Sequence, residues 1–355
     1  MLTLNEEQNP YGTETNGAPF PLISVVVPTK DRPETLRETL DSIFGQTFEN
    51  YEIVIVNDGG RSVGEIISSF GEPGNITLIE RDVCSGPSAA RNTAVDAAEG
   101  DIIVYLDDDD IYLPNHLSAI AQAMSKPNAP PVAYTRVEHR LYERNNEVWT
   151  VTERDVPPGK PFCYSDLLVK NFIPLNCLAH RKDLFLAIDG FDTHYPFLED
   201  WEMLLRLTKD IDVQYIDAVT AVYRHFSEGS SVNALTPEAI DVTRRIYETH
   251  WESAQSGLEQ RRHEHLGNLA NAIRLQNRQK VSPPVEVQLK AIKEKLAAGQ
   301  LRQVILDLDT LLERIPDDGE LLMLAAKLKT AAGEASEGER LIQRAKEKDP
   351  YLFPF

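Results

Sequence analysis

Three strand-like segments, each ending in a cluster of polar residues, constrain the fold of this chain more than any other feature. They are residues 22–27 (LISVVV), 51–56 (YEIVIV) and 102–106 (IIVYL). Runs this rich in apolar, β-branched residues are typical of parallel strands buried on both faces. Segments with helical spacing of apolar residues lie between them, at 32–46, 62–70 and 88–98. This alternation predicts an α/β fold with a doubly wound, parallel sheet.

The polar clusters lie where a ligand site is expected. Residues 29–32 (TKDR) follow the first segment, which Pro28 is expected to end. Residues 57–59 (NDG) follow the second segment, and residues 107–110 (DDDD) follow the third. Ligands of doubly wound folds bind outside the carboxyl ends of the strands. We therefore expect the three clusters to gather along one edge of the sheet.

The four consecutive aspartates at 107–110, the acidic run, indicate a bound cation. Four carboxylates held together after a buried strand would repel one another strongly. Mn²⁺ or Mg²⁺ would relieve this repulsion, since hard divalent cations prefer oxygen ligands, and a bound diphosphate would complete the coordination shell. The alternative is a solvated acidic turn. Because the run ends a strand of the predicted sheet, the metal site is the favoured interpretation.

Composition limits the classes of function. The chain has 355 residues, 42% of them hydrophobic, which is enough for two domains with real cores. A net charge of −20 argues against nucleic-acid binding and against anionic membranes. Three widely spaced cysteines predict reduced thiols in a cytoplasmic protein. No segment is apolar enough to span a membrane, and residues 1–19 are polar and expected to be disordered.

Beyond residue 130 the pattern changes. We expect antiparallel strands at 132–140 and 147–151, an irregular segment at 155–175, a helix at 198–208 and a strand at 213–223. From residue 236 the chain is predicted to be helical, with a polar break at 276–284. The predicted domains are therefore a disordered 1–19, an α/β domain at 20–235 and a helical region at 236–355.

The helical region contains a repeat. The triplet AAG at 297–299 recurs at 331–333, and Pro316 recurs as Pro350, in both cases after 34 residues. This period is that of tetratricopeptide helix pairs, which we expect at about 285–355. The alternative is an ordinary helical extension. Two repeats bury little surface, so their apolar residues, such as Val304 and Leu308, are expected to dock on the first domain or on a second subunit.

Several motifs together resemble those of a known family. They are VVVPT at 25–29, IVNDG at 55–59, AARN at 89–92 and LDDDD at 106–110, followed by GFD at 190–192 and LEDW at 198–201. In this order and spacing they resemble family 2 glycosyltransferases over roughly residues 20–230. The resemblance implies the GT-A nucleotide-diphospho-sugar transferase fold, a Rossmann-like mixed sheet with helices on both faces, here followed by the helical region.

The resemblance also implies roles for individual residues. Asp58 would hold the base and ribose, Asp109 the metal of the D-x-D signature, and Asp200 would be the general base. The unbroken acidic run leaves open how Asp107, Asp108 and Asp110 divide the remaining work. The other residues implied at the nucleotide are Pro28, Thr29, Asp31, Arg91, Asp107 and Asp108, and those implied on the acceptor side are Glu199 and Trp201.

Some of these residues have alternative interpretations. Asp200 could instead be the N-cap of the helix that follows it. Thr29 and Asp58 could be plain turn residues. His225, which follows the last expected strand, could complete the metal shell or touch the diphosphate, although a lone histidine is as often structural.

The predicted activity is sugar transfer with inversion of configuration. Direct displacement at the anomeric carbon needs one base for the acceptor proton and one cation for the departing diphosphate. We expect a nucleotide-sugar donor, UDP-sugar in first place, and a glycan or other hydroxyl acceptor, as in cell-surface polysaccharide biosynthesis. The alternatives are a sugar nucleotidyltransferase, although residues 27–31 lack its glycine-rich loop, and a non-catalytic repeat-containing binding module. A homo-oligomer or protein partner would engage the C-terminal helices.

Overall fold

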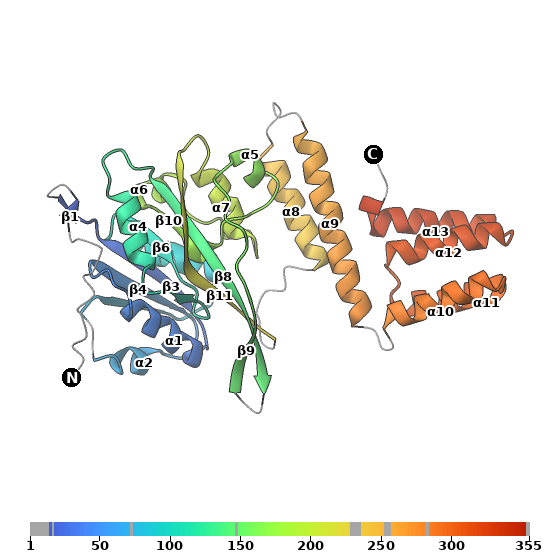
Figure 1. Ribbon diagram of the computed structural model, residues 1–355, viewed down its shortest axis with the longest axis horizontal. Coiled ribbons are helices and arrows are strands. Elements are labelled where there is room, and N and C mark those ends of the chain that lie inside the picture. Colours follow the sequence, from blue (N-terminus) through green and yellow to red (C-terminus); the bar gives the residue numbers. More distant parts are fainter. Residues whose placement is uncertain are drawn as a thin grey trace, which may run out of the picture. The chain divides into compact units, whose positions relative to one another are not determined.

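The computed structural model describes residues 14–15, 18–71, 74–145, 148–227, 236–251, 257–280 and 284–352. The contacts within the chain divide it into two compact units, Met1–Val232 and Asn233–Phe355 (Figure 1). The assignment of 20–235 and 236–355 as the two domains stays a prediction. In the described ranges no helix has the length and apolar character needed to cross a bilayer.

The first unit is built on one mixed sheet. Its strand order is β5-β4-β3-β6-β10-β8-β11-β7, and β9 pairs with β8 outside this path. The first four strands in this order are parallel, as the sequence predicts, whereas β10 is antiparallel to both β6 and β8. The strands are β3 (Ile23–Thr29), β4 (Tyr51–Asp58), β5 (Ile76–Arg81), β6 (Ile102–Tyr105), β7 (Ile111–Tyr112), β8 (Val132–Asn145), β9 (Val148–Asp155), β10 (Leu178–Arg181) and β11 (Val213–Phe226).

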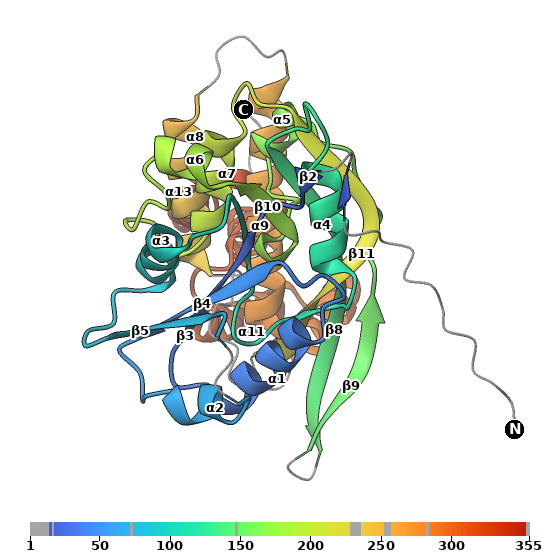
Figure 2. The same cartoon turned by 90° about the vertical axis from the view of Figure 1, so that its left-hand side faces the viewer.

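Helices pack against both faces of the parallel strands, which explains their unbroken apolar character. Val25, Val26 and Val27 are all fully buried. Figure 2 shows β3 and β4 between α1 and α3. Leu36, Leu40 and Ile43 form one face of α1 and join the core of the sheet. The helices are α1 (Pro33–Phe44), α2 (Gly64–Ser68), α3 (Pro87–Ala97), α4 (His116–Met124), α5 (Tyr164–Leu167), α6 (Lys182–Ala187) and α7 (Glu199–Leu207).

Pro28 does not end the first strand, contrary to the expectation from sequence. β3 continues through Pro28 to Thr29 and pairs there with β4. The carbonyl of Val26 accepts a hydrogen bond from the Leu106 N–H at 3.0 Å, so residue 28 would direct its own N–H toward the same side. The β6 strand ends at Tyr105, so a proline at 28 removes no ladder hydrogen bond.

Other element limits also differ from the prediction. Glu14–Thr15 (β1) and Ala18–Pro19 (β2) form a short antiparallel pair, and the remainder of the segment 1–19 lies outside the described residues. The antiparallel strands β8 and β9 are confirmed, but they run on to residues 145 and 155; residue 147 lies outside the described part. The polar break expected at 276–284 begins later than predicted, because helix α9 continues to Gln279 and α10 begins at Val285.

The second unit is helical, as predicted. Its helices are α8 (Pro237–Thr249), α9 (Leu258–Gln279), α10 (Val285–Ala297), α11 (Leu301–Arg314), α12 (Gly319–Ala331) and α13 (Ala335–Lys348), with a 3-10 turn, η2, at Pro350–Leu352. The pairs α10–α11 and α12–α13 begin 34 residues apart, and the repeated Gly299 and Gly333 both adopt positive φ. Their assignment as tetratricopeptide repeats stays a prediction.

The apolar faces of these helices are already covered within the unit. Val304, Leu308 and Leu311 are fully buried and belong to one core cluster with residues of α10, α12 and α13. The expectation that Val304 and Leu308 need the first domain or a second subunit for burial is therefore wrong. The two helix pairs, α10–α11 and α12–α13, provide enough apolar surface to cover these faces themselves.

Two arginines of α9 make buried ion pairs with residues of the repeat pairs. Arg278 donates to both carboxylate oxygens of Asp318, at 2.7 and 2.9 Å, and Arg274 pairs with Asp349 at 2.5 Å. Asp318 also caps α12 by accepting the Leu321 N–H at 3.0 Å. These pairs fix α9 to the helices that follow it.

Candidate active site

The acidic run lies between β6 and β7 in a tight turn, in which the Asp110 N–H donates to the Asp107 carbonyl at 3.0 Å. Asp108 and Asp110 are 5% and 3% exposed. A solvated acidic turn would leave these carboxylates in water, so that alternative is wrong. Buried carboxylates need hydrogen-bond donors or cations nearby, and each member of the run has them.

The end of β3 supplies the partners of Asp108 and Asp109. Thr29 Oγ1 donates to Asp108 Oδ2 at 2.7 Å, so Thr29 is more than a plain turn residue. One nitrogen of Arg32, Nη1, lies 3.1 Å from Asp108 Oδ1 and 2.5 Å from Asp109 Oδ2. The clusters at 29–32 and 107–110 therefore gather at one edge of the sheet, as the sequence predicts.

Burial changes the pKa values of the Asp108 and Asp109 carboxyls. Desolvation raises the pKa of Asp108 to about 6, although Arg32 and the Thr29 hydroxyl act to lower it. Desolvation, followed by the charge of Asp107, also raises the pKa of Asp109. The local charge balance is thus incomplete, and a further positive charge would be stabilised here.

Asp110 joins the run to β11. It accepts the Asn176 amide at 2.8 Å and the Arg224 backbone N–H at 2.9 Å. The Arg224 guanidinium contacts the Asp109 carbonyl and the Glu38 carboxylate. Burial raises the pKa of Asp110 well above its usual value. These contacts give Asp110 a structural function.

Arg91 connects the acidic run to α7. Its guanidinium lies 2.7 Å from Asp107 Oδ1 and 2.7 Å from Glu199 Oε1, and its side chain is only 5% exposed. Burial alone would lower the pKa of Arg91, but the two carboxylates raise it, so the side chain stays charged. Since both ends of the guanidinium are already paired, its implied contact with the nucleotide stays a prediction.

Asp200 lies in the first turn of α7. Leu198, with a φ of 59°, is the N-cap of this helix, so the alternative that Asp200 is the cap is wrong. The Asn171 amide donates to Asp200 Oδ2 at 2.9 Å. Burial, and then the neighbouring Glu199 carboxylate, raise the pKa of Asp200 to about 7. The carboxyl is thus balanced between its two protonation states at neutral pH.

Trp201 does not present its ring to a ligand. It is 2% exposed, and its indole N–H donates to the Leu167 carbonyl at 2.7 Å. The expectation that Trp201 contacts the acceptor therefore needs correction, because its position on α7 turns the ring into the core. Trp201 anchors α7 to the protein core.

Asp58 is the last residue of β4, and Asp31 lies two positions beyond the end of β3. Asp58, 5% exposed, accepts the backbone N–H groups of Ser85 at 3.1 Å and Gly86 at 2.7 Å. These two hydrogen bonds hold the loop that precedes α3. Asp58 therefore has a structural function in this loop, in agreement with its interpretation as a turn residue. Asp31 has a left-handed φ of 54° and accepts the Arg61 N–H at 3.0 Å. The nucleotide roles of Pro28, Asp31 and Asp58 stay predictions.

His225 lies near the carboxyl end of β11 and pairs with a second histidine. His225 Nε2 is 2.9 Å from His139 Nδ1, and the two rings stack with centroids 5.2 Å apart. Among the residues that the structure describes, no three His, Cys, Asp or Glu side chains are grouped as metal ligands. Its metal role therefore stays a prediction.

Sequence reasoning missed the residues that neutralise and orient the carboxylates. They are Arg32, Arg224, Asn171, Asn176 and His139. One signal was available, since a run of four carboxylates requires nearby cations and Arg32 stands in a cluster already singled out. Arg224 directly follows the last expected strand, whose final residues 221–223 are apolar, which is a second signal.

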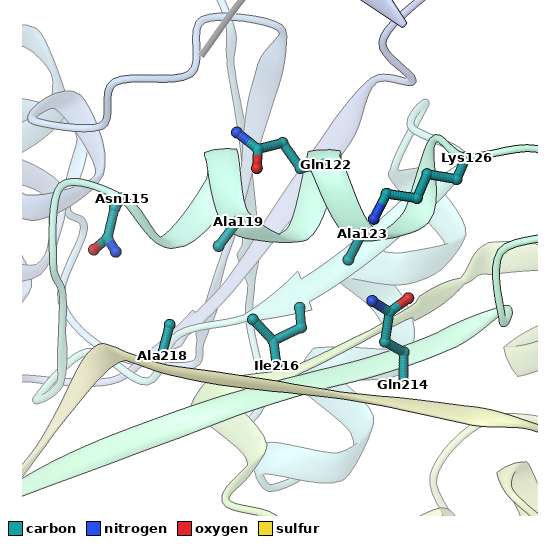
Figure 3. A pocket seen from close by; sticks show the side chains of 8 residues that line it. All are labelled: Asn115, Ala119, Gln122, Ala123, Lys126, Gln214, Ile216 and Ala218. Atoms are coloured by element: carbon teal, nitrogen blue, oxygen red, sulfur yellow. The ribbon is translucent and has the colours of Figure 1, made fainter. Parts of the chain in front are cut away.

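A pocket of about 280 Å³ lies between α4 and the first part of β11 (Figure 3). No residue of the acidic run and no other candidate site residue lines this pocket. Its lining residues are Asn115, Ala119, Gln122, Ala123, Lys126, Gln214, Ile216 and Ala218.

Comparison with known folds identifies similar architectures. The chain is similar to TarS of S. aureus, residues 1–349, with a TM-score of 0.53 and 18% identity over 92% of this chain and 91% of that one. It is also similar to the mannosyltransferase PcManGT of Pyrobaculum calidifontis, with a TM-score of 0.55 and 16% identity over 98% and 92% of the two chains. At these identities the likeness shows the fold alone, a GT-A-like mixed sheet followed by helices.

Comparison of sequences shows the family. Residues 24–182 match the model of glycosyl transferase family 2. A PGL/p-HBAD biosynthesis glycosyltransferase of Mycobacterium bovis is 28% identical over 211 residues, 58% of this chain and 78% of the relative. The uncharacterized glycosyltransferase YwdF of Bacillus subtilis is 30% identical over 218 residues, 60% of this chain and 77% of the relative. The chain is therefore a glycosyltransferase and belongs to family 2.

Proposed function

We propose that the protein is an inverting, cation-dependent transferase that moves a sugar from a nucleoside-diphosphate donor to a hydroxyl group of a glycan or another acceptor. The observation that carries this proposal is the Arg91 bridge between Asp107 and Glu199. Through this bridge Arg91 connects two parts of the site. One is the acidic run, which is suited to bind a cation, and the other is the first turn of α7, where the Asp200 carboxyl is suited to act as a base.

The residues of the acidic run fit a divalent cation. Asp108 Oδ1 and Asp109 Oδ2 converge on one positively charged nitrogen, at 3.1 and 2.5 Å. Mg²⁺ and Mn²⁺ take oxygen ligands, and nucleotide sites often use one or two carboxylates together with the phosphates of the substrate. Asp109 would be the principal ligand, and His225 is a second candidate. A cation bound there would stabilise the negative charge of the departing diphosphate.

Asp200 has the properties of the base. Its raised pKa, about 7, suits proton transfer at neutral pH. Asn171 holds one oxygen, Oδ2, which orients the carboxylate. In the proposed step the acceptor hydroxyl loses its proton to Asp200, its oxygen bonds to the anomeric carbon, and the bond from that carbon to the diphosphate breaks. One displacement inverts the configuration, and Glu199 keeps its bond to Arg91.

The donor is expected at the ends of β3, β4 and β6, where Pro28, Thr29, Asp31, Asp58 and Asp108 lie. A UDP-sugar is the first choice. TarS structures contain UDP or UDP-GlcNAc, and the PcManGT structure contains GDP-Man and Mn²⁺. All three cysteines are free thiols, which supports the proposed cytoplasmic location.

Calorimetry tests the proposal. UDP and GDP are titrated into the protein with and without Mn²⁺, and the same titrations are made with Asp109→Ala. We expect nucleotide binding that needs Mn²⁺ and that is lost in the variant with its fold intact. Undiminished affinity in Asp109→Ala would contradict the cation assignment. For any donor that is turned over, NMR of the product's anomeric proton then reports inversion or retention.

A further inference from the structure

We propose that Arg32 is a resident counter-cation of the acidic run, which a divalent cation must displace from Asp108 and Asp109 before it can bind. The inference rests on the proposed function only in placing the cation at Asp109. It adds a residue that sets cation affinity and links it to donor binding.

The first support is the geometry of Arg32. Its Nη1 atom is 2.5 Å from Asp109 Oδ2 and 3.1 Å from Asp108 Oδ1, at the point where the two carboxylates converge. A cation that used both oxygens would occupy the same space. Two positive charges this close together repel strongly in a partly buried site. Arg32 and a divalent cation therefore cannot both contact Asp108 and Asp109 at the same time.

The second support is the difference in exposure among the arginines that neutralise the run. The Arg91 side chain is 5% exposed and the Arg224 side chain is 1% exposed, so both are enclosed by the fold. The Arg32 side chain is 30% exposed, and that of Asp109 is 28% exposed. The Arg32 guanidinium therefore has room to move into solvent, whereas the Arg91 and Arg224 side chains are held in place by the surrounding protein.

The consequence is a coupling between the cation and the donor. Displacement of Arg32 costs the two charged contacts, which weakens cation binding in the absence of donor. A diphosphate provides new acceptors for the planar guanidinium, whose donors match phosphate oxygens well. We therefore expect the cation to bind weakly alone and more tightly together with a nucleoside diphosphate.

A matched pair of variants tests the inference. Arg32→Gln removes the proposed competitor, and Arg61→Gln removes the same charge from a neighbouring loop, where Arg61 is 84% exposed and lies 3.6 Å from Asp31. Free Mn²⁺ is measured by electron paramagnetic resonance during titration, first without nucleotide and then with UDP. Circular dichroism confirms that each variant is folded.

We expect Arg32→Gln to bind Mn²⁺ roughly tenfold more tightly than the wild type in the absence of nucleotide, on the scale of one charged hydrogen bond. The gain in Mn²⁺ affinity caused by UDP should be smaller in this variant. Arg61→Gln should change Mn²⁺ affinity less than about twofold, because exposed charges are screened. Thermal unfolding provides a second readout, in which Mn²⁺ restores stability that Arg32→Gln loses.

The outcomes separate this inference from the proposed function. If the wild type binds Mn²⁺ through Asp109 but Arg32→Gln binds it equally or more weakly, Arg32 is not a competitor and only the inference fails. Equal gains in both variants would reduce the effect to general electrostatics and also overturn the inference. If neither the wild type nor Arg32→Gln binds Mn²⁺ with or without UDP, both proposals fail.

Discussion

Arg91 in α3 and Glu199 in α7 form a 2.7 Å ion pair between residues 108 positions apart in the sequence. The same guanidinium holds Asp107 at 2.7 Å, so one buried cation fixes the distance between the acidic run and the helix turn that contains Asp200. The relationship makes Arg91 a positioning residue for two parts of the site that the sheet alone does not connect.

Substitution of Arg91 should uncouple these parts. In Arg91→Met two carboxylates lose their cation, and we expect a loss of about 3 kcal/mol in the free energy of unfolding, as for other broken buried pairs. Turnover should fall more than UDP affinity does, and Arg91→Lys should recover part of both losses. Urea unfolding and donor calorimetry measure these quantities. A variant of normal stability that fails to bind UDP would instead make Arg91 a nucleotide contact.

Asp200→Asn should lose transfer and keep donor binding. An amide has nearly the size of the carboxyl but cannot accept the acceptor proton, so the rate should fall about a hundredfold or more. In the wild type, transfer should rise as pH increases through about 7, where Asp200 loses its proton. Stopped assays across pH check both points, and a normal rate in the variant would exclude Asp200 as the base.

The same pKa predicts an effect on stability. The pKa of Asp200 in the folded protein, about 7, lies above its ordinary 3.8. Between these values the folded state keeps a proton that the unfolded state has lost, so this carboxyl's contribution to stability decreases as pH rises through that window. Asp200→Asn should therefore match the wild type near pH 4 and unfold at a higher temperature near pH 8. A constant difference in melting temperature would contradict the shift.

In the helical unit, the buried Arg278–Asp318 ion pair should contribute far more to the free energy of unfolding than the exposed Arg344–Asp317 pair. Arg278→Met leaves Asp318 buried without its bidentate partner and should cost about 3 kcal/mol. Arg344→Met is the control, since Arg344 lies 3.7 Å from Asp317 with both side chains about half exposed, and it should cost below about 1 kcal/mol. Thermal unfolding of the full chain compares the two. Equal effects would show that burial does not strengthen the Arg278 pair.

A chain ending near residue 235 should still bind nucleotide and Mn²⁺. Every candidate site residue precedes that position, and the core cluster formed by the sheet, α1 and α4 consists of residues before 222. Loss of the helical unit should change oligomeric state or acceptor use, because Trp251, Val287 and Leu306 each expose more than half of an apolar side chain. Light scattering and transfer assays decide. If particle mass and acceptor kinetics both stay unchanged, the helices are a passive appendage.

The sequence predicted the framework of the fold and the edge that carries the site. Unbroken runs such as 22–27 and 102–106 encode burial on both faces, and the polar residues that follow them necessarily share one edge. The limits of the elements were less accessible, because whether Pro28 ends a strand depends on where the neighbouring strand stops. Local patterns do not report that relation.

The electrostatic design of the candidate site could not be predicted in the same way. Arg32, Arg91 and Arg224 are 76, 16 and 115 positions from their partners in the acidic run. A repulsion argument correctly demands positive charge near residues 107–110, but it cannot choose between a metal ion and side chains brought in by tertiary structure. For Trp201, a motif indicated function, whereas helical periodicity turned the ring into the core.

The contact between Asp110 and the Arg224 backbone spans 114 positions. Because loops of this length close slowly, the edge that holds the acidic run should be completed late in folding. The match to the family ends at residue 182, well before Arg224. During synthesis the aspartates therefore emerge long before β11. Until that strand joins the sheet, the acidic run lacks its contacts with Arg224 and the carboxylates repel one another. A chain truncated before residue 226 would keep this repulsion permanently.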